Sequence, residues 1–131
     1  MKAPAFLTID QVLAIHHRVI KEFGGNPRVR DRGLLESAVL LPSAQYDGEY
    51  LHPDLPSMAA AYLFHICKNH PFADGNKRTA LATAEVFLLV NGWRLKATND
   101  EVAELTLAVA AAEIGKDAVI EFFRKLSLIH I

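Results

Sequence analysis

The chain has 131 residues, of which 51% are hydrophobic and 22% charged, and its net charge is close to −1 at pH 7. This length predicts one domain, spanning residues 1–131, with a hydrophobic core of its own. The nearly neutral chain lacks the positive field typical of nucleic-acid binding, so direct binding of DNA or RNA is not expected. The first residues, MKAPAFLTIDQV, lack the apolar core expected of a signal peptide. The longest apolar run, 80–90, contains Glu85 and is too short to cross a bilayer. A cytoplasmic protein without membrane binding is expected. The single cysteine, Cys67, is expected to be a buried thiol in the core.

The N-terminal part of the sequence predicts two helices. Thr8 and Gln11 form a capping-box pattern, and apolar residues then recur at helical spacing until the glycines at 24–25. Asp31 is expected to cap a second, shorter helix that Pro42 ends.

Two strongly apolar helices are predicted further along the chain. They are preceded by residues 42–56, which are rich in proline and whose length favours a lid or binding loop of open role. Ser57 is expected to cap a helix whose residues 58–67 are apolar on nearly every face, as in a central helix surrounded by others. The next helix is expected to run from about Asn76 to Asn91, where a glycine follows.

The C-terminal part predicts a short extended piece at 93–95 and two further helices. Thr98 and Glu101 form another capping box, which begins a helix toward Gly115, and apolar residues at helical spacing predict a last helix over 119–126. Because no alternating strands and no repeats are visible, the expected fold class is all-α. The architecture would be a compact helical bundle in which a central buried helix pair flanks a polar segment.

That polar segment, HPFADGNKR at residues 70–78, combines residue types suited to phosphate chemistry. Gly75 lets the backbone approach an anion, and the Asn76 amide can reach a phosphate oxygen. Lys77 and Arg78 would both lie in the first turn of a helix, where cations oppose the macrodipole unless an anion is bound. An anion site at this helix start is therefore favoured over a plain helix start.

The remaining polar residues of the segment add a carboxylate and a base. Asp74 is either the cap of the following helix or a ligand of Mg²⁺, which is commonly held by one or two carboxylates together with phosphate oxygens. Pro71 disfavours helical geometry at His70, so the imidazole is expected outside the preceding helix, where it can accept a proton from a hydroxyl. Phe72 is expected to turn inward as an apolar anchor, and His65 to be a hydrogen-bonded core residue.

Three arginines upstream of the polar segment have an open role. Arg28, Arg30 and Arg32 alternate along the chain. They line a groove for the target protein or form a solvated basic edge, and the spacing alone does not decide between the two.

Segment 70–78 resembles the signature HxFx[DE]GNx[RK] of the Fic/Doc superfamily, all-helical proteins that transfer parts of nucleotides to protein hydroxyls. Residues 29–38, VRDRGLLESA, are similar to the upstream block of the death-on-curing branch, and NGW at 91–93 follows at the familiar distance. The resemblance covers about residues 8–126. Lys77 stands where AMP-transferring relatives have a glycine, and Leu81 where they have a second arginine, and both differences point to phosphoryl transfer.

The resemblance implies the toxin of a toxin–antitoxin pair: a protein kinase that uses ATP and Mg²⁺ to phosphorylate a threonine of translation elongation factor Tu. By matching positions, it assigns catalytic roles to His70, Asp74 and Arg78, the Mg²⁺ to Asp74, and the phosphate cradle to Gly75, Asn76, Lys77 and Arg78. AMP transfer to a protein hydroxyl and a catalytically silent module that binds an antitoxin or a nucleotide are the alternatives, with a nuclease toxin a distant third.

The resemblance also implies a partner. Many self-inhibited relatives carry the pattern [ST]xxxE[GN], but no serine or threonine of this chain is followed four positions later by a glutamate. Restraint is therefore expected from a separate antitoxin, whose Phd-like C-terminal segment would fold as a helix into a surface groove.

Overall fold

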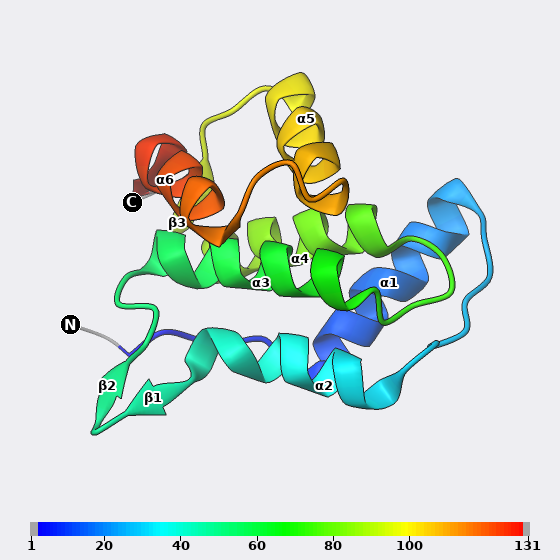
Figure 1. Cartoon of the computed structure of the whole chain (residues 1–131), viewed down its shortest axis with the longest axis horizontal. Coiled ribbons are helices and arrows are strands. Elements are labelled where there is room, and N and C mark those ends of the chain that lie inside the picture. The colour runs from blue at the N-terminus through cyan, green and yellow to red at the C-terminus, as the bar shows by residue number, and fades with distance from the viewer. Residues whose placement is uncertain (1–2, 130–131) are drawn as a thin grey trace.

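The computed structural model describes residues 3–129, which form six α-helices, one 3₁₀ turn and two small antiparallel sheets (Figure 1). The helices are α1 (Ile9–Phe23), α2 (Arg32–Leu40), α3 (Leu55–Asn69), α4 (Asn76–Val90), α5 (Asn99–Ala110) and α6 (Lys116–Leu126). The short elements are η1 (Leu41–Ser43), β1 (Gln45–Tyr46), β2 (Glu49–Tyr50), β3 (Trp93–Leu95) and β4 (Ser127–Ile129). The expected all-α class is confirmed.

Helix α3 is the centre of the molecule. It packs against α2, α4, α5 and α6, and Figure 1 shows α4 beside it, with α5 and α6 on one side and α2 on the other. Ten of its 15 residues are buried, as its apolar faces predicted. The neighbouring α4 buries Ala80, Ala84, Phe87 and Leu88. These two helices form the expected buried pair, and the polar segment 70–78 connects them.

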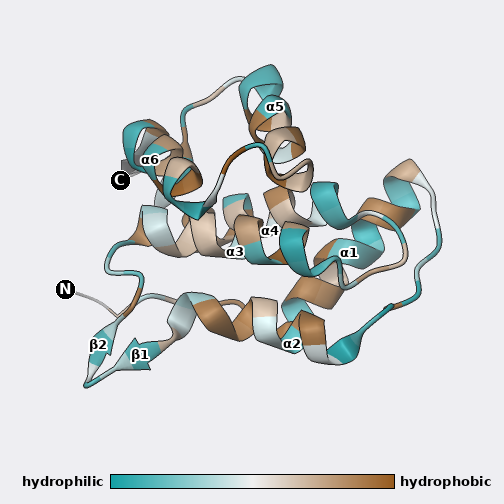
Figure 2. Ribbon diagram, viewed as in Figure 1, coloured by the Kyte–Doolittle hydropathy of each residue, from teal (hydrophilic) through white to brown (hydrophobic). Residues whose placement is uncertain are grey.

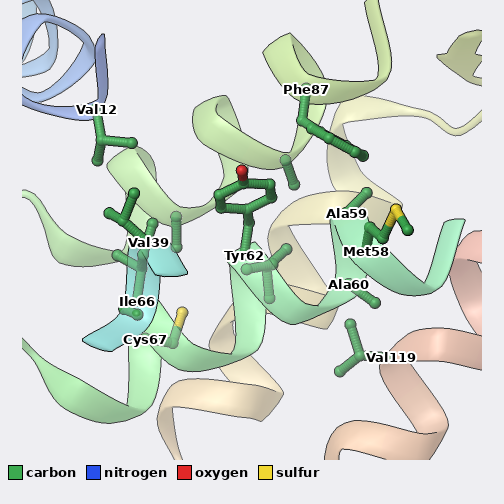
Figure 3. Close-up of a cluster of buried hydrophobic side chains, with 14 of the residues drawn as sticks. Val12, Val39, Met58, Ala59, Ala60, Tyr62, Ile66, Cys67, Phe87 and Val119 are labelled. Atoms are coloured by element: carbon green, nitrogen blue, oxygen red, sulfur yellow. The ribbon is translucent and has the colours of Figure 1, made fainter. Parts of the chain in front are cut away.

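The core brings together side chains from distant parts of the chain. Figure 3 shows Tyr62 of α3 between Val12 of α1, Val39 of α2 and Phe87 of α4. The Tyr62 hydroxyl accepts a hydrogen bond of 3.0 Å from the Leu7 N–H, and burial raises the pKa of this phenol to about 12. The N-terminal segment is thereby tied to the central helix.

The predicted helix starts are confirmed with one exception. Thr8 and Thr98 form complete capping boxes at α1 and α5, and Asp31 caps α2. The prediction that Ser57 caps α3 is wrong, because the cap is Asp54, whose carboxylate accepts from the Ser57 N–H at 2.8 Å. Ser57 is instead the third residue of the helix and completes the box, after a proline in the first turn.

The strands were not expected beyond the extended piece at 93–95. Within residues 42–56, β1 and β2 form a hairpin whose turn residues Asp47 and Gly48 have φ of 52° and 81°, as a two-residue hairpin turn requires. The hairpin is largely hydrophilic (Figure 2) and lies at the end of α3 opposite to segment 70–78 (Figure 1). A lid over that segment, one role favoured for 42–56, does not fit this position. At the other sheet β3 pairs with β4.

None of the described helices is both long enough and apolar enough to span a lipid bilayer.

Candidate active site

The site is built on the loop between α3 and α4, where the chain leaves one buried helix and enters another. Helix α3 ends at Asn69, and His70 follows as its C-cap in the left-handed conformation, with φ 50° and ψ 53°. The His70 residue is exposed. The prediction that Pro71 keeps this histidine out of the helix is confirmed, and the imidazole is available at the surface beside the loop.

Phe72 anchors the loop in the core, as expected. Its side chain is fully buried and stacks on the His16 ring of α1, with 3.7 Å between ring centroids and 6° between planes. The His16 Nε2 lies 2.8 Å from the Asp74 carbonyl oxygen, which can only accept, so this nitrogen carries the proton. Burial lowers the pKa of His16, and the ring therefore holds the loop as a neutral donor near pH 7.

Asp74 is not the cap of α4, which was one of its two expected roles. Its Oδ2 accepts a hydrogen bond of 2.7 Å from the Asn26 N–H. A Cβ built on Gly25 would lie 2.9 Å from the Asp74 Cβ, so only glycine allows this close approach. The carboxylate is exposed, and its direction is set by the chain after α1.

Helix α4 begins without any side-chain cap. Its N-cap is Gly75 in the left-handed conformation, with φ 80°. The first backbone hydrogen bond of the helix runs from the Thr79 N–H to the Gly75 carbonyl at 2.9 Å, so the N–H groups of residues 76–78 have no intrahelical acceptor. They make no hydrogen bond within the described part of the chain. A Cβ on Gly75 would meet Val19 and Ile20 of α1 at 3.3 Å.

The Asn76 side chain has a different role from the expected contact with a phosphate oxygen. Its Oδ1 accepts from the Phe72 N–H at 3.0 Å, and its Nδ2 donates to the Phe72 carbonyl at 2.9 Å. The residue is buried. The carboxamide thus fixes the curvature of the loop, and any contact of Asn76 with an anion would come from its backbone N–H.

Two exposed cations, Lys77 and Arg78, stand in the first turn of α4, which contains no acidic residue. The Arg78 guanidinium carbon lies 4.1 Å from the centre of the Phe23 ring, so an aromatic face on α1 orients it. Three unpaired N–H groups, the positive end of a helix and two cations form an electropositive cradle.

A cleft of about 400 Å³ between α1 and α4 adjoins this cradle. Its lining is mainly apolar and includes Leu81, with charged side chains among the lining residues: Arg18, Glu22, Arg78 and Glu85. Burial raises the pKa of Glu85.

The connection between α1 and α2 runs along the loop and holds it in place. The Ala73 N–H donates to the Arg28 carbonyl at 2.9 Å, and the Val29 and Phe72 positions form an antiparallel β-bridge. The Arg30 guanidinium donates to the carbonyls of Asn69 and His70. We call residues 24–31 the strap.

Sequence reasoning missed the strap contacts and the contribution of His16. For two of the three upstream arginines, the structure gives contacts that neither open alternative had named. Arg30 binds backbone carbonyls, whereas Arg32 pairs with Glu36 on the surface of α2 at 3.2 Å. The one signal in the sequence was the pair of glycines at 24–25, at the start of the strap. These glycines do not reveal that Asp74 is the residue they approach.

Among residues 70–78, Asp74 has the one carboxylate that could hold a metal ion. The described residues contain no group of three or more histidine, cysteine, aspartate or glutamate side chains that would hold a metal ion. A single exposed carboxylate beside this electropositive cradle would suit Mg²⁺ if phosphate oxygens and water completed the shell of the ion.

A second polar cluster lies away from the loop. His65 of α3 accepts at Nε2 from the Lys116 ammonium of α6 at 2.9 Å, which gives it the hydrogen-bonded position expected of it. Burial, followed by the Lys116 charge and by His52, lowers the pKa of His65 to about 4.

Comparisons of the sequence with known proteins identify its family. The sequence model of the Fic/DOC family matches residues 6–88. The chain is 42% identical over 99 residues to the protein named Toxin Doc of Mycolicibacterium smegmatis. The aligned stretch covers 74% of this chain and 76% of that protein. The chain is also 34% identical over 117 residues to Protein kinase doc of Escherichia phage P1, with 89% of this chain and 91% of that protein covered. The chain therefore belongs to the Fic/DOC family.

Proposed function

We propose that this protein is the toxin of a toxin–antitoxin pair, and that it transfers the γ-phosphate of ATP to a threonine hydroxyl of translation elongation factor Tu and so blocks translation. The observation that carries the proposal is the start of α4, where three N–H groups and two cations have no hydrogen-bond or ion-pair partner among residues 3–129. The exposed His70 begins the loop that leads into this helix. The names of the two relatives, a toxin and a protein kinase, support the toxin role and the phosphoryl transfer. Elongation factor Tu as the target rests on the family resemblance.

In this proposal the cradle binds the phosphates. The N–H groups of residues 76–78 donate to phosphate oxygens, while Lys77 and Arg78 neutralise charge. Asp74 would hold Mg²⁺ together with the phosphates, and Mg²⁺ would lower the repulsion that an incoming nucleophile meets. Phosphoryl transfer suits such a site, because its catalysis consists mostly of positioning and charge stabilisation.

His70 acts as the general base in this reaction. The hydroxyl oxygen of the target forms a bond to the γ-phosphorus, and its proton passes to the His70 imidazole. The bond from the γ-phosphorus to the bridging oxygen breaks, so that ADP leaves with that electron pair. A positioned base of this kind accelerates a reaction by about 10²- to 10⁴-fold.

Two residues favour transfer of the γ-phosphate over transfer of AMP. Lys77 extends a long cation from the first turn of α4, where it occupies room that a further phosphate subsite would need. Leu81 lines the adjoining cleft with an apolar side chain, at the position where AMP-transferring relatives have an arginine. We therefore propose that ATP lies with its γ-phosphate toward the hydroxyl.

Labelled nucleotide distinguishes the activities. The protein is incubated with elongation factor Tu, MgCl₂ and either γ-labelled or α-labelled ATP, with His70→Ala as the control. Label on the factor only from the γ position supports the proposal. Label from the α position identifies AMP transfer, and label from neither contradicts both activities and leaves a binding module.

The antitoxin completes the proposal. The cleft between α1 and α4 has a mainly apolar lining and shares Arg78 with the cradle, so an amphipathic helix bound there would lie next to the nucleotide. We propose this cleft as the groove for the antitoxin segment. Ala82, half-buried in the cleft, gives the test: Ala82→Trp should keep toxicity in growing bacteria but escape neutralisation by the antitoxin candidate encoded beside the gene. Full neutralisation would contradict this position.

A further inference from the structure

Arg30 makes an unusual set of contacts for an exposed arginine. Its Nε donates to the His70 carbonyl at 2.7 Å, and its Nη2 donates to the Asn69 carbonyl at 3.0 Å. Its own N–H donates to the Pro71 carbonyl at 2.7 Å. Three consecutive carbonyls, on both sides of the candidate base, are therefore bound by one residue that lies about 40 positions earlier in the chain.

These carbonyls need an external partner. The last carbonyls of a helix have no intrahelical donor, and they carry the negative end of the macrodipole. Pro71 has no N–H with which to turn back toward α3. A forked guanidinium satisfies two of these acceptors at once and brings a positive charge to the end of the dipole.

The backbone at His70 is strained and depends on such support. A left-handed conformation is uncommon and energetically unfavourable for a residue other than glycine. The following proline would favour an extended conformation at this position. Without hydrogen bonds to its carbonyl, the His70 backbone would shift toward the extended conformation, and the imidazole would move with it.

We infer that Arg30 is a positioning residue that holds His70 in the left-handed conformation and so directs the imidazole to the γ-phosphate site. This inference rests on the proposed function for its catalytic consequence, although its structural part does not. The Arg30 guanidinium donates to two backbone carbonyls, which favours a structural role over a contact with the target protein. The nucleotide cradle starts at Gly75, on the other side of the loop.

Kinetics test the catalytic part with Arg30→Ala and a matched control. The control is Arg124→Ala, which removes an arginine bonded through Nε to Asp54 at the opposite end of the same helix. Arg30→Ala should lower kcat for γ-phosphate transfer by about tenfold or more, since misplacing a catalytic group by about 1 Å can cost 10²-fold. KM for ATP should stay within twofold, because the cradle is intact. Arg124→Ala should change neither constant.

The conservative variant sharpens this test. Arg30→Lys keeps the charge but not the fork, so it should recover part of the lost kcat. Equal kcat in wild type and Arg30→Ala would overturn the inference, as would equal losses in Arg30→Ala and Arg124→Ala.

A structural measurement separates this inference from the proposed function. In protein labelled with ¹³C histidine, the Cα and Cβ shifts of His70, assigned with His70→Ala, report its backbone conformation. They should move toward extended values in Arg30→Ala, move less in Arg30→Lys, and stay constant in Arg124→Ala. Unchanged His70 shifts in Arg30→Ala would overturn the inference. If wild type transfers no label, the proposed function fails and these shifts alone decide the role of Arg30.

Discussion

Helices α4 and α6 begin alike in sequence but differ in what surrounds their first turn. Both start at a glycine without a side-chain cap, and both have a lysine in the first turn. Lys116 of α6 is half-buried and bonded to His65, and an aspartate follows it. Lys77 of α4 is exposed, next to a second cation and to no acid. A cation at a helix start therefore indicates an anion site only where the fold leaves it unpaired.

The largest expected effect is the loss of activity when His70, which precedes α4, is replaced. His70→Ala should lower phosphoryl transfer by about 10²- to 10⁴-fold, because it removes the base. The free energy of unfolding should change little, since the side chain is exposed. Single-turnover assays with γ-labelled ATP and urea unfolding measure the two quantities. The exposed His17 of α1 offers the control, and comparable activity loss in His17→Ala would contradict a specific role for His70.

His65, which is bonded to Lys116 at the start of α6, should affect the free energy of unfolding and not the activity. Its effect should depend on pH. Its pKa is lowered to about 4 in the folded state, against about 6.5 unfolded. Below pH 6.5 the unfolded chain takes up a proton before the folded one, so stability is full above pH 6.5 and falls as the pH drops toward 4. The full shift corresponds to about 3–4 kcal/mol. Because His65 is partly exposed, solvent screening should reduce the loss to about 2–3 kcal/mol. His52 and Lys116, whose pKa values are also lowered, face the same cluster.

His65→Gln isolates this contribution. The glutamine does not titrate and can still accept from Lys116, so the variant should lose less stability than wild type between pH 7 and pH 4 in urea unfolding. Parallel curves for the two proteins would show that His65 is not the titrating group.

Neutralising one lysine at each helix start tests the comparison directly. Lys77→Gln should weaken binding of Mg²⁺-ATP about tenfold, which corresponds to about 1.4 kcal/mol. Lys116→Gln should leave this affinity unchanged, because Lys116 is bonded within the protein. Titration calorimetry gives both values. Equal affinities in all three proteins would remove Lys77 from the phosphate site.

The smallest expected effect is on the free energy of unfolding, and it should have opposite signs for the lysines of the two helices. Without nucleotide, Lys77→Gln should raise the free energy of unfolding by about 0.3–1 kcal/mol at low salt, since the lysine opposes the macrodipole. Lys116→Gln should lower it, because the charged bond to His65 is lost. Urea unfolding in phosphate-free buffer at low ionic strength checks both signs, and a loss of stability in Lys77→Gln would mean that this cation is already paired.

Most of the helices could be predicted from the sequence because the signals for a helix are local. The apolar faces of α3 and the capping boxes at Thr8 and Thr98 each lie within a few residues. The cap of α3 was misassigned because Asp54 and Ser57 are both good capping residues, and the choice depends on the proline between them. The hairpin was missed because two-residue strands are too short to show alternation, although Asp47–Gly48 is a turn signal.

The site was predictable only where it is contiguous. Segment 70–78 displays its residue types directly, whereas the contacts that shape it come from α1 and the strap. Arg30 and His70 are 40 positions apart, and His16 and Asp74 are 58 apart. Nothing in a single sequence indicates which side chains meet across such distances. The internal use of the Asn76 amide was missed for a different reason: its partner Phe72 is only four positions away, but residue types alone do not show the turn that brings the two together.

The single cysteine has a practical consequence. Cys67 is only 7% exposed, and burial raises the pKa of its thiol to about 11, so only about one molecule in 10⁴ would carry a thiolate there at pH 7. A cysteine introduced at Tyr46 of the hairpin, a residue that is 78% exposed, would then be the one thiol that reacts quickly with maleimides. A fluorophore attached there would lie at the opposite end of α3 from segment 70–78, where it can report encounters with other proteins without obstructing the proposed active site.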